Sequence, residues 1–132
     1  MKIMKYLRQA GIGIFLTALI ASFFAMNVTS ADKGYVGEDD TIVELVRNYQ
    51  KQPTYPRKAL RIGLEGYVVV EFDVDTDGAV LDPYVLEAVP QGTFERAAIK
   101  AIRSWVYQAP THNGQSVKVN NVKVKLTFAF AN

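Results

Sequence analysis

Residues 52 to 80, QPTYPRKALRIGLEGYVVVEFDVDTDGAV, form the stretch that decides the fold. Pro56 suits the first turn of a short helix, and Gly63 suits the position just past its end. Residues 67 to 74 then place apolar side chains at every second position, which is typical of a strand with one buried face. Asp75-Thr76-Asp77-Gly78 predicts a tight turn in which Gly78 takes a positive φ. The stretch therefore predicts a helix, a strand and a reverse turn in succession.

The patterning on either side of this stretch predicts four further elements. Residues 80 to 88 form a return strand, in which Pro83 indicates a sheet edge or a bulge. Apolar residues recur at helical spacing from Phe94 to Trp105 and predict an amphipathic helix. Residues 122 to 130 alternate, so the last strand is expected to bury one face. Upstream, residues 41 to 49 combine a capping box with helical spacing and predict a short amphipathic helix.

Composition and charge exclude several classes of function. The 132 residues suffice for one domain with its own core. The absence of cysteine excludes disulfides, thiolate metal sites and a cysteine nucleophile. Lys2, Lys5 and Arg8 account for three of the 15 basic residues, which leaves 12 basic against 13 acidic residues in the rest of the chain. A nearly neutral body gives no electrostatic reason to expect nucleic acid as a partner.

An apolar run of 17 residues, Ala10 to Met26, follows these three basic residues. The layout is typical of a signal peptide or a signal anchor, and the length is compatible with both. Small residues at positions 29 to 31 provide a cleavage site in the first case. In either case the positive flank stays in the cytoplasm and the remainder is exported. We therefore expect a signal or anchor segment at 1–31, a linker carrying the short amphipathic helix at 32–51, and one domain at 52–132.

Two features resemble chemical sites but have simpler interpretations. Asp73 to Gly78 matches the beginning of a calcium loop, D-x-D-x-D-G, yet Tyr84 stands where the closing Glu belongs and strands flank the motif. A hairpin turn with solvated acids is therefore favoured over a calcium site. His112, the single histidine, lies in a Pro/Asn/Gly loop without partner ligands and is expected at the surface. No catalytic residue, metal ligand or cofactor site is predicted, so we do not expect an enzyme.

The motifs, taken together, resemble the C-terminal domain of the TonB family over about residues 52 to 130. The matching residues are Gln52-Pro53-x-Tyr55-Pro56, Glu65-Gly66-Tyr67-Val68, Phe72-x-Val74-x-x-Asp77-Gly78-x-Val80, Val85-Leu86-x-Ala88-x-Pro90, Phe94-Glu95-Arg96-Ala97-Ala98, Arg103-x-Trp105-x-Tyr107 and the terminal strand. The resemblance implies an α+β fold, a two-layer domain in which an antiparallel sheet of three to four strands packs against two helices.

The resemblance also implies a periplasmic protein-binding module in TonB-dependent transport, either free after signal cleavage or anchored in the inner membrane. Such a module grips an extended segment of an outer-membrane TonB-dependent receptor and passes on energy from inner-membrane proton-channel proteins. Two features depart from the family pattern. The apolar run contains no histidine, and all five prolines lie from Pro53 onward, so no Pro-rich linker precedes the domain. The resemblance therefore covers the recognition module rather than its connection to the channel.

We predict that the partner binds by pairing with the edge of the last strand. The predicted partner-binding residues are Gln52, Pro53, Tyr55, Val122, Lys123, Val124, Lys125, Leu126, Thr127, Phe128 and Ala129. The lysines of this strand either protect an exposed edge from aggregation or flank a groove for an acidic peptide. The alternative function is a structural protein of the cell envelope. It would bind an envelope partner, or itself as a homodimer, through the 41–49 helix and the free sheet edge.

Overall fold

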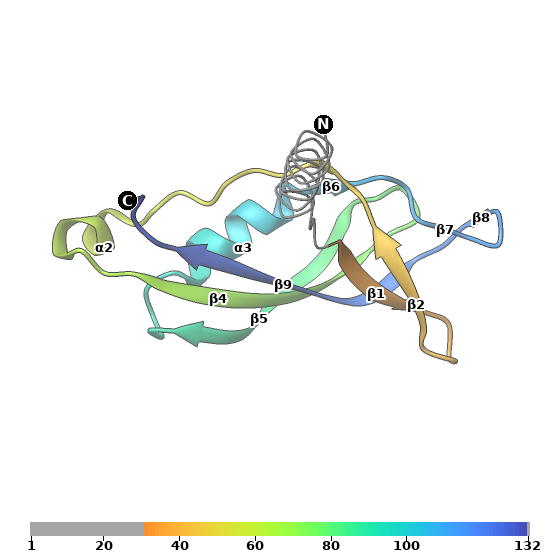
Figure 1. Ribbon diagram of the computed structural model, residues 1–132, viewed down its shortest axis with the longest axis horizontal. Helices are drawn as coiled ribbons and strands as arrows, with labels where there is room; N and C mark the ends of the chain where they lie inside the picture. The colour runs from red at the N-terminus through yellow and green to blue at the C-terminus, as the bar shows by residue number, and fades with distance from the viewer. Residues whose placement is uncertain (1–30, 132) are drawn as a thin grey trace, which may run out of the picture. The chain divides into compact units, whose positions relative to one another are not determined.

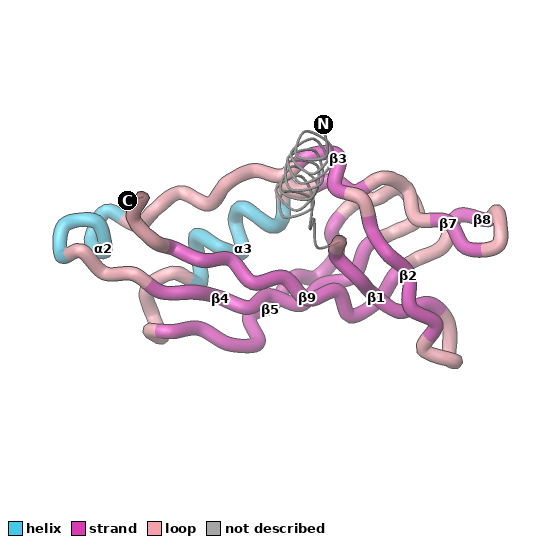
Figure 2. The backbone as a smooth tube through the Cα atoms, viewed as in Figure 1, coloured by secondary structure: helices cyan, strands magenta, loops and turns pink. Residues whose placement is uncertain are grey.

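The computed structural model describes residues 31–131, drawn as a ribbon in Figure 1 and as a tube in Figure 2. Residues 1–30 of the predicted signal or anchor segment, including the run from Ala10 to Met26, lie outside the described residues, so this part of the sequence analysis stays a prediction. Within residues 31–131, no helix combines the length and the apolar character needed to cross a membrane.

The domain is built on a five-stranded antiparallel sheet with the strand order β2–β1–β9–β4–β5. The strands are β1 (Asp32–Val36), β2 (Thr41–Leu45), β4 (Gly66–Val74), β5 (Val80–Val89) and β9 (Val119–Phe128). Figure 1 shows helix α3 (Glu95–Arg103) lying across one face of the sheet, and the short helix α2 (Arg57–Ile62) at one end. The α+β class, the antiparallel sheet and the two helices are confirmed, whereas the sheet has five strands rather than three or four.

The core lies between α3 and the sheet, as the alternation of the strands predicts. The four even-numbered residues of β4, from Val68 to Val74, are at most 1% exposed. Alternate residues of β9, from Val122 to Phe128, line the same layer, and α3 adds Ala98 and Ile102. Apolar burial stabilises a fold by about 25 cal/mol per Å², so this layer is the main source of stability.

The predicted helix at residues 41–49 is wrong. Residues Thr41–Leu45 form β2, which pairs with β1 as a hairpin, and Arg47–Tyr49 form β3, which pairs with β6 (Val106–Tyr107). Ile42 and Val46, two of the residues at helical spacing that suggested the helix, are 61% and 58% exposed. The segment alternates as well as it follows helical spacing, and pairing with β1 decides in favour of the strand because it joins the segment to the main sheet.

The turn and the irregular strand predicted around residue 80 are both present. Gly78 has φ of 91°, and a Cβ atom there would lie 2.0 Å from the carbonyl oxygen of Tyr107, so only glycine fits. In β5, Asp82 has φ of 48° and the pairing with β4 shifts register twice, which places one bulge beside Pro83 and another at Leu86. A small hairpin of β7 (Thr111–His112) and β8 (Gln115–Ser116) carries the histidine, which is partly exposed.

Candidate functional site

The predicted docking strand is β9, and the structure pairs only one of its sides along its full length. β4 pairs with β9 from Gly66↔Phe128 to Val74↔Val119. On the other side, β1 pairs with β9 at Tyr35↔Asn120 alone. Within the described residues, the side of β9 from Lys123 to Phe128 therefore has no strand partner. The edge strands of the sheet are β2 and β5. β9 is therefore an interior strand that is unpaired on one side over part of its length.

The segment from Lys51 to Tyr55 is fixed to the body of the domain at both ends. The Trp105 indole Nε1 donates a hydrogen bond to the carbonyl oxygen of Lys51 at 2.8 Å. At the other end, the Tyr55 hydroxyl donates to the carbonyl oxygen of Leu64. The Tyr55 ring packs on three phenylalanines, namely Phe94, Phe128 and Phe130, at centroid distances of 5.7, 5.7 and 5.1 Å. Tyr55 therefore holds this segment beside the end of β9.

A network of side chains far apart in the sequence joins the start of β1 to the rest of the domain. Asp32 accepts hydrogen bonds from the Arg47 guanidinium and, at 2.7 Å, from the Tyr107 hydroxyl. The Arg47 guanidinium also lies 4.6 Å from the centroid of the Trp105 ring. The hydrogen bond to Asp32 raises the pKa of Arg47, and burial raises the pKa of Tyr107. Arg47 is thus charged and Tyr107 neutral at physiological pH, as this network requires.

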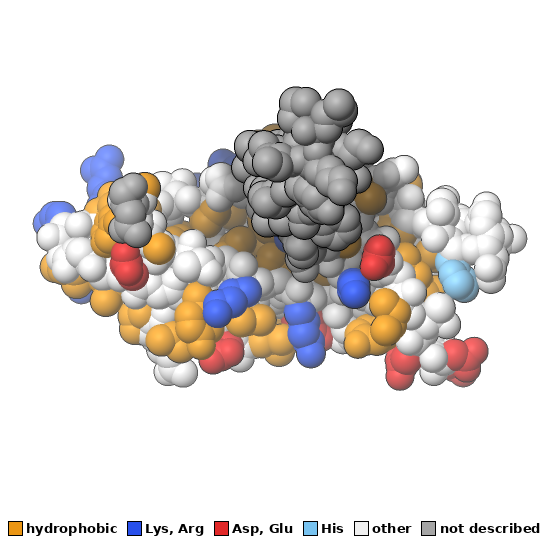
Figure 3. All heavy atoms as spheres, in the orientation of Figure 1, with side chains coloured by type: hydrophobic (Ala, Val, Ile, Leu, Met, Phe, Trp, Pro, Cys, Tyr) orange, Lys and Arg blue, Asp and Glu red, His pale blue; other side chains and the backbone are white. Residues whose placement is uncertain are grey.

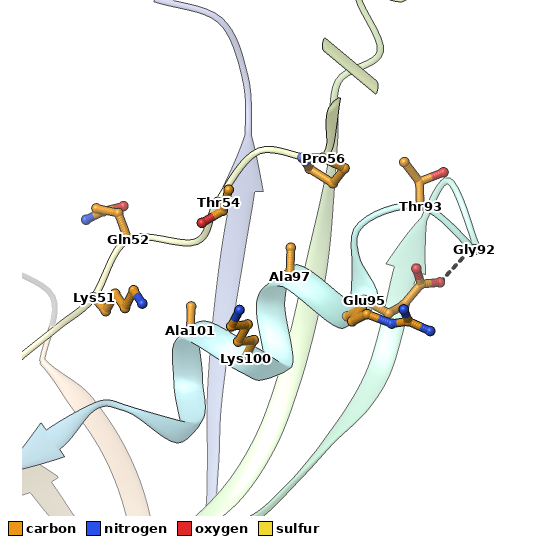
Figure 4. Close-up of a pocket in the computed structure, with 11 residues that line it drawn as sticks. Lys51, Gln52, Thr54, Pro56, Gly92, Thr93, Glu95, Ala97, Lys100 and Ala101 are labelled. Atoms are coloured by element: carbon orange, nitrogen blue, oxygen red, sulfur yellow. Dashed lines mark hydrogen bonds between the residues drawn. The ribbon is translucent and has the colours of Figure 1, made fainter. Parts of the chain in front are cut away.

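A groove of about 760 Å³ runs between the 51–56 segment and α3 (Figure 4). It is lined by Lys51, Gln52, Thr54, Pro56, Gly92, Thr93, Glu95, Arg96, Ala97, Lys100 and Ala101. Of the predicted partner-binding residues, only Gln52 lines it. Pro53 lies in the same segment, Tyr55 packs inward, and the remaining residues belong to β9, except Ala129, which follows the end of that strand. Gln52 thus lines the groove beside α3, and Tyr55 is a packing residue.

Glu95 closes the turn that precedes α3. Its carboxylate accepts a hydrogen bond from the Gly92 N–H, drawn as a dashed line in Figure 4. This bond, and others from backbone N–H groups at the start of the helix, lower the pKa of Glu95. Thr93, which lies next to this turn, makes no such capping contact, and the N-cap position is occupied by Phe94. The start of α3 is therefore stabilised by a carboxylate.

Glu95→Gln is expected to reduce the dependence of the free energy of unfolding on pH below neutral pH. Because hydrogen bonds from backbone N–H groups hold the folded-state pKa of Glu95 below its ordinary value, the ionised side chain stabilises the fold at neutral pH. This contribution is lost as the pH falls through the folded-state pKa. Urea unfolding between pH 7 and pH 3 should show the variant less stable at pH 7, with a difference in unfolding free energy that shrinks as the pH falls. Glu38→Gln, in the exposed β1–β2 turn, is the control and should leave the profile unchanged, and a constant gap at all pH values would contradict the prediction.

The described residues contain no group of three or more His, Cys, Asp or Glu side chains that could hold a metal ion. In the motif that resembles a calcium loop, the Asp75 carboxylate accepts the N–H groups of Asp77 and Ala79. Asp73 pairs with Lys118 at 3.3 Å and accepts the N–H of Asn121. These carboxylates therefore have protein partners, which supports the interpretation as a hairpin turn.

An antiparallel sheet with a helix on one face and an unpaired strand side within the described residues defines a small α+β domain. Residues 51–130 match the family described as Gram-negative bacterial TonB protein C-terminal, and the chain belongs to this family. The resemblance drawn from the motifs is thereby confirmed. The family consists of binding and energy-transducing proteins rather than enzymes, which confirms the expectation of a non-enzymatic protein.

Curated relatives called protein TonB are similar to the chain over the same region. The relative from Yersinia enterocolitica is 45% identical over 58 residues, which are 44% of this chain and 23% of that protein. The relative from Escherichia coli K12 is 41% identical over 71 residues, 54% of this chain and 29% of that protein. For Xanthomonas campestris pv. campestris B100 the identity is 34% over 87 residues, 66% of this chain and 39% of that protein. The chain spans well under half the length of these relatives.

Two solved structures share the fold. The solution NMR structure of the Pseudomonas aeruginosa TonB C-terminal domain superposes with a TM-score of 0.52 at 30% identity, covering 76% of this chain and 94% of that one. The TonB2 protein of Vibrio anguillarum gives a TM-score of 0.53 at 33% identity, covering 80% of this chain and 98% of that one. These similarities confirm the fold as that of a TonB C-terminal domain.

Proposed function

We propose that this domain takes part in TonB-dependent transport by binding an extended segment of an outer-membrane TonB-dependent receptor. The segment adds as a strand to the side of β9 between Lys123 and Phe128. The observation that carries the proposal is that this side has no strand partner within the described residues, although the opposite side pairs along the whole strand. Strand addition supplies affinity through main-chain hydrogen bonds and specificity through alternate side chains.

Two further observations support this side of β9 as the docking edge. The register of β9 is fixed, because Val122, Val124, Leu126 and Phe128 are buried, and a shift by one residue would expose all of them. The exposed residues between them, Lys123, Lys125 and Thr127, are then available to contact the partner's side chains. In addition, Tyr55 packs on Phe128, which positions the fixed 51–55 segment next to the end of the free side.

We further propose that the chain acts in the periplasm, either anchored in the inner membrane by residues 10–26 or free after signal cleavage. The run from Ala10 to Met26 and its basic N-terminal flank support export. Inner-membrane proton-channel proteins are proposed partners only if the segment is retained. Intact-mass measurement of the envelope protein distinguishes the two forms, and a full-length product in the cytosol contradicts both.

Site-specific cross-linking in intact cells tests the docking edge. Because the chain has no cysteine, Thr127→Cys introduces one thiol on β9. A receptor carrying one cysteine in its extended periplasmic segment should form a mixed disulfide with it, with a yield that alternates along the segment. Lys58→Cys, exposed on α2, is the matched control and should give none. Equal yields at Lys58 and Thr127 would exclude strand addition at β9.

The alternative, a structural envelope protein that uses the 41–49 helix, loses that element because the segment forms β2 and β3. An envelope partner could still bind at β2, because β2 is an edge strand and its Ile42 is exposed. Cross-linking from Ile42→Cys to envelope proteins, with the receptor absent, would favour this function.

A further inference from the structure

Basic side chains gather on the helical side of the domain. Helices α2 and α3 and the segment 51–56 carry one acidic residue, Glu95, whose carboxylate already accepts backbone N–H groups. The same elements carry seven exposed basic residues, namely Lys51, Arg57, Lys58, Arg61, Arg96, Lys100 and Arg103. The other acidic residues lie elsewhere, and Figure 3 shows a group of them at the β1–β2 turn, at the lower right of the view. The helical side is therefore positively charged although the domain as a whole is nearly neutral.

Four of these cations line two adjoining hollows along α3. The groove shown in Figure 4 has Lys51 on one wall and Arg96 and Lys100 on the other. A second hollow of about 640 Å³ shares Arg96 and Lys100 with this groove and adds Arg103 and the apolar Ile99. Among the described residues, none of the four cations forms an ion pair. We call these two hollows the basic groove, and its convergent cations are suited to phosphate groups.

Exposed apolar side chains lie close in sequence to two of the cations of the basic groove. Tyr49 of β3 pairs with Val106 of β6, and the two side chains are 54% and 42% exposed. They point away from the core, because the next residue, Tyr107, is buried and successive residues of a strand point to opposite faces. Tyr49 lies two residues before Lys51, and Val106 lies three residues after Arg103. An aromatic and an aliphatic side chain flanked by cations are typical of surfaces that enter the headgroup region of a bilayer.

The chain enters the domain beside these same strands. Asp32, the first residue of β1, accepts hydrogen bonds from side chains of β3 and β6, which are the strands that carry Tyr49 and Val106. Five residues, 27 to 31, separate Asp32 from the apolar run that ends at Met26. Even a fully extended chain of this length spans at most about 18 Å. In the anchored form, the end of the domain that carries Asp32 is therefore held close to the surface of the bilayer.

We propose that the basic groove, together with Tyr49 and Val106, binds the anionic phospholipid headgroups of the membrane in which the chain is anchored. The cations pair with the lipid phosphates, and the two apolar side chains enter the headgroup layer. Because the tether keeps the bilayer at a high effective concentration, contacts that are individually weak suffice for docking. The inference rests on the anchored form of the proposed function. In that form the short tether holds the domain at the inner membrane, whereas the form freed by cleavage reaches the outer membrane unaided.

Fluorescence quenching in lipid nanodiscs tests the docking with the full-length chain. Because the chain has no cysteine, Val106→Cys carries a single fluorophore, and the discs contain a phospholipid with a nitroxide on its headgroup. Discs with about 30% phosphatidylglycerol should quench the fluorophore at least about threefold more strongly than discs of phosphatidylcholine alone. Val89→Cys is the matched control, since Val89 is 46% exposed and pairs with Tyr67 on the face of the sheet that α3 does not cover. Its quenching should be weak in both kinds of disc.

A matched pair of charge reversals locates the docking surface. Lys100→Glu combined with Arg103→Glu should lower the quenching to its level in phosphatidylcholine discs. Lys58→Glu combined with Arg61→Glu makes the same change in net charge at the same spacing on α2, which lies at the other end of the sheet from β1, and should keep more than about half of the quenching. Circular dichroism verifies that both variants are folded. The proposal is overturned if the control site is quenched as strongly, if phosphatidylglycerol has no effect, or if both reversals lower the quenching equally.

Failure of the docking and failure of the proposed anchoring give different results. The nanodiscs hold the uncut chain, so weak quenching there contradicts lipid docking and leaves the anchoring untouched. Complete cleavage in cells, detected by the intact mass of the envelope protein, overturns the anchored form and with it the docking, even where the nanodisc result is positive. Receptor binding is measured separately at β9, which does not contribute to the basic groove.

Discussion

Trp105→Ala is expected to lower the free energy of unfolding by about 3–5 kcal/mol and to weaken partner capture at the same time. The side chain is 1% exposed within the core, so its removal leaves a large cavity. Its indole N–H also holds Lys51, and its ring lies beneath the Arg47 guanidinium. One substitution therefore removes core packing and releases one end of the 51–55 segment, which links stability to the candidate site.

Trp105→Phe separates these two effects. Phenylalanine retains much of the buried ring but cannot donate to Lys51, so we expect a smaller loss of about 1–3 kcal/mol. Urea unfolding followed by circular dichroism measures the stability of both variants. The dependence of the unfolding free energy on urea concentration should be the same in both. Val106→Ala, at a neighbouring side chain that is 42% exposed, is the control and should change stability by less than about 1 kcal/mol. A Trp105→Ala variant as stable as this control would contradict the role assigned to Trp105.

The elements predicted correctly from the sequence are those whose burial pattern is long and unambiguous. β4 and β9 alternate over nine and ten residues, and α3 repeats its apolar stripe over several turns. The helix predicted at residues 41–49 is wrong because a segment of five to nine residues fits both the helical and the strand periodicity. Pairing with β1 decides in favour of the strand. Residues 32–36 carry no strong apolar pattern, and nothing local identifies them as a strand.

The contacts that organise the site depend on positions that are far apart in the sequence. Asp32 lies 15 residues from Arg47 and 75 residues from Tyr107, and no spacing rule connects such residues. The same limitation applies to Tyr55, whose motif suggested a groove residue and whose ring packs on Phe94 and two other aromatic side chains. The sequence patterns pointed to the strand and the segment that we propose as the site, whereas the contacts that anchor them became visible only in the fold.

Binding of a partner strand to the free side of β9 is expected to slow hydrogen exchange at individual backbone amides of that strand. Successive residues of a strand direct their N–H groups to opposite sides, so only every second amide between Lys123 and Phe128 faces the free side. In the free chain these amides should exchange hydrogen quickly, while those bonded to β4 exchange slowly. A peptide with the sequence of a receptor's extended segment should slow the fast set by roughly tenfold or more and leave the slow set unchanged.

The alternation is what distinguishes strand addition from other modes of binding, because side-chain docking on a face of the sheet or in the groove beside α3 has no reason to affect every second amide. Lys125→Pro, which removes one N–H, is expected to abolish capture of the peptide, whereas Lys125→Ala keeps the main chain and should weaken it little. Circular dichroism of the proline variant must first show a native fold, since proline within a sheet also disturbs the ladder. If the folded proline variant still binds at the affinity of the parent chain, or if the slowed amides lie in β2 or β5, the partner does not pair with β9. Binding would then be assigned to the margin of the sheet or to the segment from Gln52 to Tyr55.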